Sequence, residues 1–598
     1  MSLTIQLLGR PAIDRGSSDA YRFRSRKSWG LLAYLILSER PPSRSQLATL
    51  LFGSADDPLR ALRWSLTEIR RALGDAASVE GNPVVLQLPA DAGVDVDVVT
   101  RGAWADAVRL PGLGADLLEG MAFREAAAFE SWLLSEQRHF VAASEAILHE
   151  AALSAMSRGA VEEATGYAVR VVSVNPLDEN YQALLIRLYR LAGDNDAAAR
   201  QLAICTELFA RELDVIPGPA VHAAMQDPSS RSEGLADDAS IKAIVEAGSA
   251  AVAAGAVEAG VHSLRVAVTL ADAASSDRLR STSRLALAEA LIHSLRGRDE
   301  EGSAALHVVD EIALASNELG LVAEARAELG YVEFLRARYD RAELWLTDAL
   351  RLAGGSQWMT AKATAYLGSI ESDRANYPKA LAHLEEATKV SRDVGDVRRE
   401  AYALSMLGRV HLLRNDVDEA ASRLDISIEL SEREHWLAFM PWPQALRGEV
   451  ELARSNPEGA TEFLQQAFAR ACQLGDPCWE GMAARGVALA AEATGETERA
   501  FEILAEARIR CNRFADPYVW LDVYILDAQC DLGRRHGHTE TEFWIESMHE
   551  LSSRTGMKEF IVRSLLHRAA IGNNGDAAAA RLLGSHIDNP ALVRLLEA

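Results

Sequence analysis

A repeat of about forty residues dominates the C-terminal half of the chain. Glycines recur there at spacings of 38, 40, 40 and 38 residues: Gly330, Gly368, Gly408, Gly448 and Gly486. Alanines recur at spacings of 38, 40, 40 and 40 residues: Ala342, Ala380, Ala420, Ala460 and Ala500. Each pair brackets a turn-forming segment such as ARYDRA or ANYPKA, so each unit is expected to be helix, turn, helix. Stacking such units predicts an α-solenoid over residues 241–598.

The spacing resembles that of the tetratricopeptide repeat, whose minimal period is about 34 residues. Small residues twelve positions apart would lie where two antiparallel helices cross closely; in the fifth unit the separation is fourteen. Fainter copies at Gly248/Gly260, at Ala290/Gly302 and near Ala528 extend the array to about eight units. The alternative to a solenoid is an unrelated alanine-rich helical bundle.

The N-terminal region has a different pattern. LTIQLLG is a candidate strand, residues 27–38, 43–52 and 56–75 are candidate helices, and PVVLQLP (83–89) and VDVDVV (94–99) are strand-like. A strand, three helices and a terminal hairpin predict a winged helix-turn-helix over residues 1–100. Residues 101–225 are expected to be all-helical, and the polar residues 226–240 to be a linker. The fold class predicted for the whole chain is therefore mainly α.

Charge is unevenly distributed along the chain. The net charge is −24, yet residues 1–75 hold 12 Lys and Arg against 7 Asp and Glu. This asymmetry indicates a basic nucleic-acid-binding module joined to an acidic body. The alternative is a local fluctuation in composition.

The basic residues concentrate on the helix predicted at residues 59–73. At 100° per residue its leucines and Ile69 form one apolar stripe, and polar or basic residues face the other way. Arginine suits nucleic acid because its planar fork bonds phosphates and guanine in pairs. The alternative is a solvated face whose arginines pair with acids, as Glu68 and Arg71 could. The candidate DNA-contacting residues are Arg24, Arg26, Lys27, Arg44, Arg60, Arg63, Trp64, Thr67, Glu68, Arg70 and Arg71.

Motifs of enzymes are missing from the sequence. There is no P-loop, nucleophile elbow, H-E-x-x-H or dinucleotide fingerprint, so we expect no enzyme activity, cofactor or metal. His536 and His538 stand near glutamates but match no metal template. Five tryptophans are candidates for a ligand groove, although solenoid core is the more common role of such residues: Trp345, Trp358, Trp436, Trp442 and Trp479. With no signal peptide, no long apolar stretch and unpaired cysteines, a cytoplasmic protein without membrane contact is expected.

Four segments resemble the SARP family of bacterial antibiotic regulatory proteins, in the family's order. RALRWSLTEIRRALGD resembles the family's recognition helix and SRSQLATLLF the helix before it. NPLDENYQALLIRLYRLAGDNDAAA and ELDVIPGPAV (212–221) resemble parts of its bacterial transcriptional activator domain. The resemblance implies a winged helix and an activator domain over residues 1–225, with promoter DNA and RNA polymerase as partners. It also implies that the acidic loop 53–58 faces the polymerase.

The resemblance has one departure at the DNA-contacting helix. The family often has a basic residue where Glu68 stands, and Glu68 could instead accept a hydrogen bond from cytosine. The expected function is a DNA-binding transcriptional regulator, most consistent with an activator, whose solenoid senses a protein or small-molecule effector. The alternative is a repeat-based scaffold whose N-terminal module binds protein or RNA. The sequence leaves open the operator, the effector, activation against repression, and whether the chain forms a homodimer.

Overall fold

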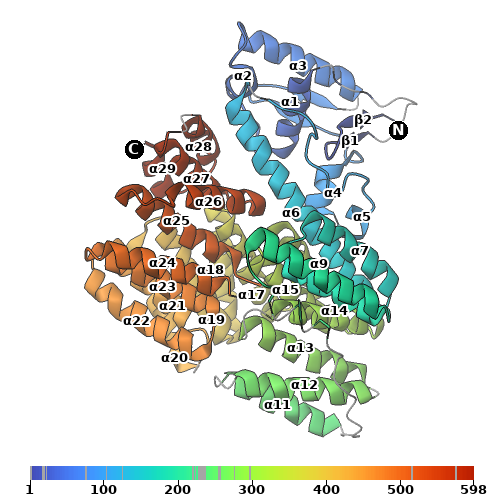
Figure 1. Ribbon diagram of the computed structural model, residues 1–598, viewed down its shortest axis with the longest axis vertical. Helices are drawn as coiled ribbons and strands as arrows, with labels where there is room; N and C mark the ends of the chain where they lie inside the picture. The colour runs from blue at the N-terminus through green and yellow to red at the C-terminus, as the bar shows by residue number, and fades with distance from the viewer. Residues whose placement is uncertain are drawn as a thin grey trace.

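The structure is a computed structural model of a mainly helical chain (Figure 1). It describes the chain except for residues 1, 2, 16–20, 22, 24, 39, 75, 76, 103, 124, 219, 220, 223, 226–237, 254–256, 275, 295–297, 435, 514, 515, 573, 574 and 598. The small N-terminal domain lies at one end of the molecule, and helical hairpins form the rest (Figure 1). Most of the linker predicted at 226–240 lies outside the described residues, since the next helix begins at Asp238.

The N-terminal domain combines two small sheets with three helices. Its elements are β1 (Thr4–Gln6), β2 (Ala12–Asp14), α1 (Arg26–Leu37), α2 (Arg44–Phe52), α3 (Pro58–Leu73), β3 (Ser78–Glu80), β4 (Val85–Gln87) and β5 (Gly93–Val94). One sheet has the order β2-β1-β5, with β1 antiparallel to β2 and parallel to β5. The other is the antiparallel hairpin β3–β4, which follows α3 as a wing does in a winged helix.

The strand predicted at residues 94–99 is wrong beyond its first residue. Only Gly93–Val94 is extended, and α4 (Asp95–Arg101) begins immediately afterwards. The alternating Val and Asp residues looked like a strand, but Val96 and Val99 are buried at the i, i+3 spacing of a helix. Asp95 fixes this start, because its carboxylate accepts hydrogen bonds of 2.8–2.9 Å from the amides of Leu7 and Leu8. The hairpin partner of β4 is β3, which the sequence pattern did not reveal.

A long helix joins the N-terminal domain to the rest. After α5 (Trp104–Ala107), helix α6 (Ala127–Ser157) runs for 31 residues from the N-terminal domain into the body of the molecule (Figure 1). Its first half packs on α1, where a Cβ added to Gly30 would lie 2.8 Å from the Phe129 ring. The Tyr34 and Trp132 rings, 4.8 Å apart, extend this contact. Helices α7 (Val161–Val174), α8 (Glu179–Leu191) and α9 (Asn195–Leu213) complete the predicted helical region.

The remaining helices form the solenoid as antiparallel pairs. They are α11 (Asp238–Ala253), α12 (Val257–Ala273), α13 (Asp277–His293), α14 (Asp299–Ala315), α15 (Leu319–Leu335), α16 (Tyr339–Leu352), α17 (Gln357–Asp373), α18 (Tyr377–Val394), α19 (Val397–Leu413), α20 (Val417–Arg433), α21 (Pro441–Ala453), α22 (Pro457–Leu474), α23 (Pro477–Ala493), α24 (Thr497–Cys511), α25 (Val519–His536), α26 (Thr541–Thr555), α27 (Lys558–Ala570), α28 (Asp576–Gly584) and α29 (Pro590–Glu597). The solenoid prediction is confirmed.

The recurrent glycines lie where paired helices cross. A Cβ added to Gly408 would lie 2.5 Å from Cγ of Leu424, and Gly330, Gly368 and Gly448 face equivalent leucines. The recurrent alanines are fully buried. The fifth unit differs: Gly486 faces Leu464 of the preceding pair. This shift accounts for the fourteen-residue separation seen there in the sequence.

The solenoid curves back so that distant units meet. Arg409 of α19 donates hydrogen bonds to Asp373 of α17 at 2.5 Å and to the hydroxyl of Tyr518, just before α25, at 2.7 Å. Helix α6 packs against α14 near one end of the array and against α26 and α28 near the other (Figure 1). The activator region and the solenoid therefore form one packed body, which the sequence did not predict.

Candidate nucleic-acid interface

Residues of α3 and the residue just before it fix where the helix begins and which face is buried. Asp57 caps its N-terminus by accepting a 2.9 Å hydrogen bond from the amide of Arg60, and Pro58 occupies the first turn. The apolar stripe predicted for this helix is confirmed, since the members are at most 1% exposed: Leu62, Leu66, Ile69 and Leu73. Burial of that stripe fixes which side chains face outward.

The opposite face of α3 presents arginine, tryptophan and threonine to solvent. Arg60, Arg63, Thr67 and Arg71 are exposed, and the indole of Trp64 is 55% exposed. Within the described part of the chain, Arg60, Arg63 and Arg71 form no ion pair. A large exposed aromatic among unpaired guanidinium groups is typical of a surface that contacts an anionic polymer.

Glu68 is a correction to the predicted set. It does not lie on the exposed face: the residue is 7% exposed, and Ser28 of α1 donates a 2.5 Å hydrogen bond to its Oε2. The helical projection put Glu68 beside Arg71, but α1 covers that side of α3. A carboxylate held in this way is not free to accept a hydrogen bond from a base.

Two of the predicted arginines hold the hairpin in place. The Nε of Arg70 donates a 2.8 Å hydrogen bond to the carbonyl of Val79 in β3. The Nε of Arg44, at the start of α2, donates to the carbonyl of Gly81 at 3.0 Å. Both side chains thus sit between α2, α3 and the hairpin turn. They extend the basic surface of α3 towards the wing, which carries no Lys or Arg of its own.

The basic residues ahead of α1 divide into three cases. Arg26 is exposed at the first turn of α1. Lys27 is half-buried, lies 3.6 Å from Glu125 and is 5.6 Å from the centre of the Phe52 ring. Arg24 lies outside the described residues. Of these, only Arg26 is placed as a free exposed cation.

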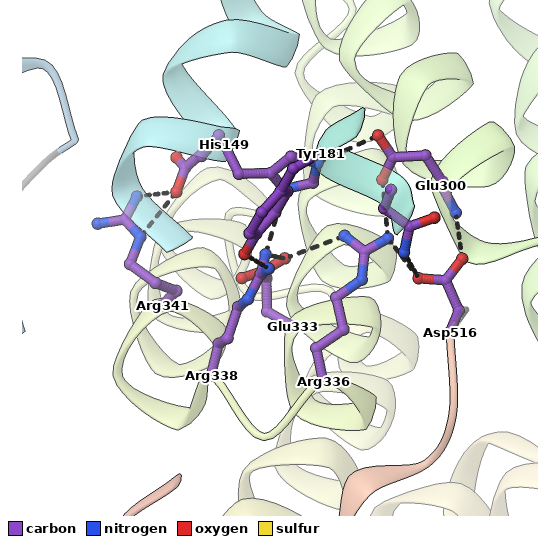
Figure 2. Close-up of polar contacts among 10 residues, drawn as sticks. His149, Tyr181, Glu300, Glu333, Arg336, Arg338, Arg341 and Asp516 are labelled. Carbon is purple, nitrogen blue, oxygen red and sulfur yellow. Dashed lines mark hydrogen bonds and ion pairs between the residues drawn. The ribbon is translucent and has the colours of Figure 1, made fainter. Parts of the chain in front are cut away.

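The activator region and the solenoid are joined by a network of charged side chains (Figure 2). Arg338, at the turn between α15 and α16, donates to the Tyr181 hydroxyl at 2.6 Å and lies 3.2 Å from Nδ1 of His149. The other ring nitrogen of His149 is 3.1 Å from Glu300 of α14. Arg336 bonds both Glu300 and Asp516, at 2.9 and 3.0 Å. The network joins α6 and α8 to three separate parts of the solenoid.

In and near this network, burial raises the pKa values of the carboxyl groups, and the neighbouring cations lower them. Burial disfavours ionisation of Glu300, but His149 and Arg336 outweigh it and hold the pKa of its carboxyl below its usual value. Burial raises the pKa of Glu150 to about 7, although Arg341 opposes the shift. Burial lowers the pKa of His307 to about 4. Two of these arginines, Arg338 and Arg341, belong to ARYDRA (337–342), for which the sequence pattern indicates only a repeat turn.

Comparison with known families decides what the region after the winged helix is. Residues 95–227 match the model of the bacterial transcriptional activator domain. Residues 95–227 are similar to a bacterial transcriptional activator domain, and this region is called the activator domain from here on. The resemblance to SARP-type activators is confirmed for this domain, and its match begins at the residue that starts α4. No curated protein sequence matches the chain.

Solved structures with related helical arrangements are distant. Mycobacterium tuberculosis EmbR in complex with a low-affinity phosphopeptide is 19% identical, with a TM-score of 0.28 over 37% of this chain and 64% of that one. This chain thus spans less than two thirds of the EmbR chain. A Rap protein complexed with competence and sporulation factor is 10% identical, with a TM-score of 0.41. The match covers 60% of this chain and 99% of the Rap chain. Yeast Tom70 is 11% identical, with a TM-score of 0.29. The match covers 69% of this chain and 93% of the Tom70 chain.

The histidine pair near residue 536 and the apolar helices of the described residues serve neither of the other roles that such sequences can have. In the described ranges, no group of three or more His, Cys, Asp or Glu side chains is placed to hold a metal ion, and this includes His536 and His538. His538 instead stacks on Trp544, with ring centres 4.6 Å apart. None of the helices in the described residues combines the length and apolar character needed to span a membrane.

Proposed function

We propose that the protein is a sequence-specific, DNA-binding transcriptional activator of the cytoplasm. The observation that carries this proposal is the outer face of α3. It places Arg60, Arg63 and Arg71 in solvent without carboxylate partners among the described residues, with Trp64 and Thr67 between them. In a winged helix this helix enters the major groove, where arginine reads guanine and a threonine methyl can contact thymine.

We assign phosphate contacts to the other basic residues of the domain, Arg44, Arg70 and Arg26, from the positions of their side chains. Arg44 and Arg70 are tied to backbone carbonyls of the wing through Nε, which leaves their terminal nitrogens to bond phosphates. Arg26 adds an exposed cation at the start of α1. Such contacts fix the position of the domain on the duplex, whereas the centre of α3 selects the sequence. Glu68 has no base-reading role in this proposal.

The activator domain supports recruitment of RNA polymerase as the means of activation. It follows the winged helix directly, and α6 packs on α1, so the two domains are in direct contact. The loop at residues 53–58 remains a candidate polymerase contact. One of its two aspartates, Asp57, is already engaged as the cap of α3, which leaves Asp56 as the acid outside the cap.

Genome-wide mapping of bound DNA tests the proposal in the cell. The chain is compared with the variant R60Q/R63Q/R71Q and with a control that removes the same charge elsewhere, R211Q/R278Q/R499Q. The control arginines are 64–72% exposed. We expect discrete sites for the wild type and control, and their loss in the α3 variant. Unchanged sites in the α3 variant would contradict DNA binding through α3 and favour the scaffold alternative.

A further inference from the structure

The inner side of the solenoid encloses a cavity of about 550 Å³. Its wall comes from α11, α13, α15, α17, α19, α21 and α23 and from the segments before α21 and α25. Ten aromatic residues line it in a chain whose aromatic content is only 6%. They are Tyr331, Phe334, Trp358, Tyr366, Tyr402, Trp436, Phe439, Trp442, Trp479 and Tyr518. Four of the five tryptophans weighed from the sequence are among them, and Trp345 is not.

The aromatic rings form a continuous wall. The rings of Tyr331 and Tyr366 are 4.5 Å apart at 32°, and Tyr366 is followed by Tyr402 at 5.8 Å. Trp436 and Phe439 stack at 4.2 Å with an interplanar angle of 12°. Trp436 and Trp358 are partly exposed, whereas the others are buried. Flat ring faces of this kind favour a planar ligand, which can stack in an offset arrangement.

The two glutamates of the cavity wall have partners within the protein. Glu328 is bonded to His293 at 2.6 Å and forms an ion pair with Lys362. Lys362 also lies 3.2 Å from Glu289. Lys362 is thus shared by two glutamates, so its ammonium is already engaged within this side of the wall.

Two arginines on the other side lie near Asp396 of the same wall but are not within ion-pair distance of a carboxylate among the described residues. Arg398 and Arg399, in the first turn of α19, form no ion pair within the described ranges. The guanidinium of Arg399 lies 4.9 Å from the centre of the Tyr366 ring, and its buried Nε has no hydrogen-bond acceptor among the described residues. Arg398 lies 5.9 Å from the Trp436 ring. Other arginines of the solenoid are paired with carboxylates, as Arg326 and Arg447 are.

We propose that this cavity binds a small planar aromatic molecule that carries an acidic group. The rings stack between the aromatic walls, and the anion bonds Arg398 and Arg399 at the N-terminal end of α19. The volume falls in the range of about 300–1,000 Å³ that is usual for small-molecule sites. This goes beyond the proposed DNA binding and does not depend on it.

The position of the cavity suits an effector. Phe334, in its wall, lies two residues before Arg336, and Tyr518 lies two residues after Asp516. Arg336 and Asp516 belong to the network that contacts the activator domain (Figure 2). A ligand in the cavity thus contacts the same helix end and the same loop that hold this domain.

Fluorescence titration of the full chain with two matched probes tests the proposal. The probes are 1-anilinonaphthalene-8-sulfonate and N-phenyl-1-naphthylamine, which share a ring system but differ in the anionic group. We expect one site for the sulfonate, with affinity reduced at least about tenfold in R398Q/R399Q, the size of effect that a lost charge-assisted contact gives. The affinity for the neutral probe should change less than about threefold, because stacking alone holds it.

Two further variants complete the design. Trp358→Ala with Trp436→Ala should weaken both probes, and R351Q/R499Q, which removes exposed arginines elsewhere, should weaken neither. Thermal unfolding confirms that each variant is folded. Added 2-naphthoate should displace the sulfonate, whereas 2-naphthylmethylammonium should not. Unchanged sulfonate affinity in R398Q/R399Q, or equal displacement by the ammonium compound, would overturn the proposal.

Discussion

Arg341 of the solenoid and Glu150 of the activator domain form a buried ion pair. The Nε of Arg341 donates to Oε2 of Glu150 at 2.7 Å, and both side chains are 5% exposed. Arg341 also donates a 3.0 Å hydrogen bond to the carbonyl of Gly102. Residues nearly two hundred positions apart are thus joined in one contact, and the two domains share a single packed interface.

Breaking this pair from one side should be costly. We expect Arg341→Met to lower the free energy of unfolding by about 3 kcal/mol, because it leaves the Glu150 carboxyl buried without its partner. The double variant R341M/E150M should recover most of that loss, since two apolar side chains replace the pair. Calorimetric melting measures both. If R341M melts like the wild type, the domains do not dock in solution as they do here.

Glu68 should matter for folding rather than for DNA sequence preference. We expect Glu68→Ala to reduce stability by about 1–3 kcal/mol, because Ser28 then loses its buried acceptor. The exposed neighbour Thr67 is the matched control: Thr67→Ala should leave stability within about 0.5 kcal/mol and alter base preference. Urea denaturation and binding to a randomised DNA pool test the two effects. A changed base preference in Glu68→Ala would contradict this assignment.

The recurrent glycines should be intolerant of even one methyl group. We expect Gly408→Ala to cost about 1–3 kcal/mol, since its Cβ would lie 2.5 Å from Leu424. Gly320, in α15, has no heavy atom within 4 Å of an added Cβ. Gly320→Ala should therefore stabilise the chain by up to about 1 kcal/mol through helix propensity. Urea unfolding compares the two variants, and equal effects would argue against the crossing described for the glycine.

His307 should make stability depend on pH. Burial lowers its pKa to about 4, against about 6.5 in the unfolded chain. Between these values the unfolded state binds the proton and the folded state does not, so the contribution of His307 falls as the pH falls. From pH 7 to pH 5 the stability advantage of the wild type over His307→Gln should shrink by about 2 kcal/mol. A pH-independent difference would show that His307 is not buried in its neutral form.

Much of the fold followed from local signals in the sequence. The capped start of α3, its apolar stripe and the solenoid pairs each depend on residues close together in the chain, which is why spacing predicts them. The strand prediction for residues 94–99 was wrong because a V-D-V-D-V-V run is compatible with both a strand and a helix. The contact between Asp95 and the amides of Leu7 and Leu8 is what favours the helix.

Side chains whose position depends on distant segments could not be predicted. Glu68 looked exposed on an isolated helix, but α1 covers it. Arg338 and Arg341 looked like turn residues, since nothing local indicates that α6 and α8 lie against them. The aromatic cavity collects residues from repeats spread over nearly two hundred positions, and each ring alone resembled ordinary solenoid core.

The salt dependence of DNA binding tests the central claim most directly. Affinity of the full chain for its target DNA is measured from 50 to 300 mM salt, for the wild type, R60Q/R63Q/R71Q and the control R211Q/R278Q/R499Q. We expect the affinity of the α3 variant for target DNA to fall at every salt concentration, because the variant lacks the base-reading arginines. The slope of log affinity against log salt should flatten by at most about 0.9 for each of the three charges removed. The control should keep the wild-type slope. Equal slopes and affinities for all three proteins would contradict α3 as the DNA-binding surface.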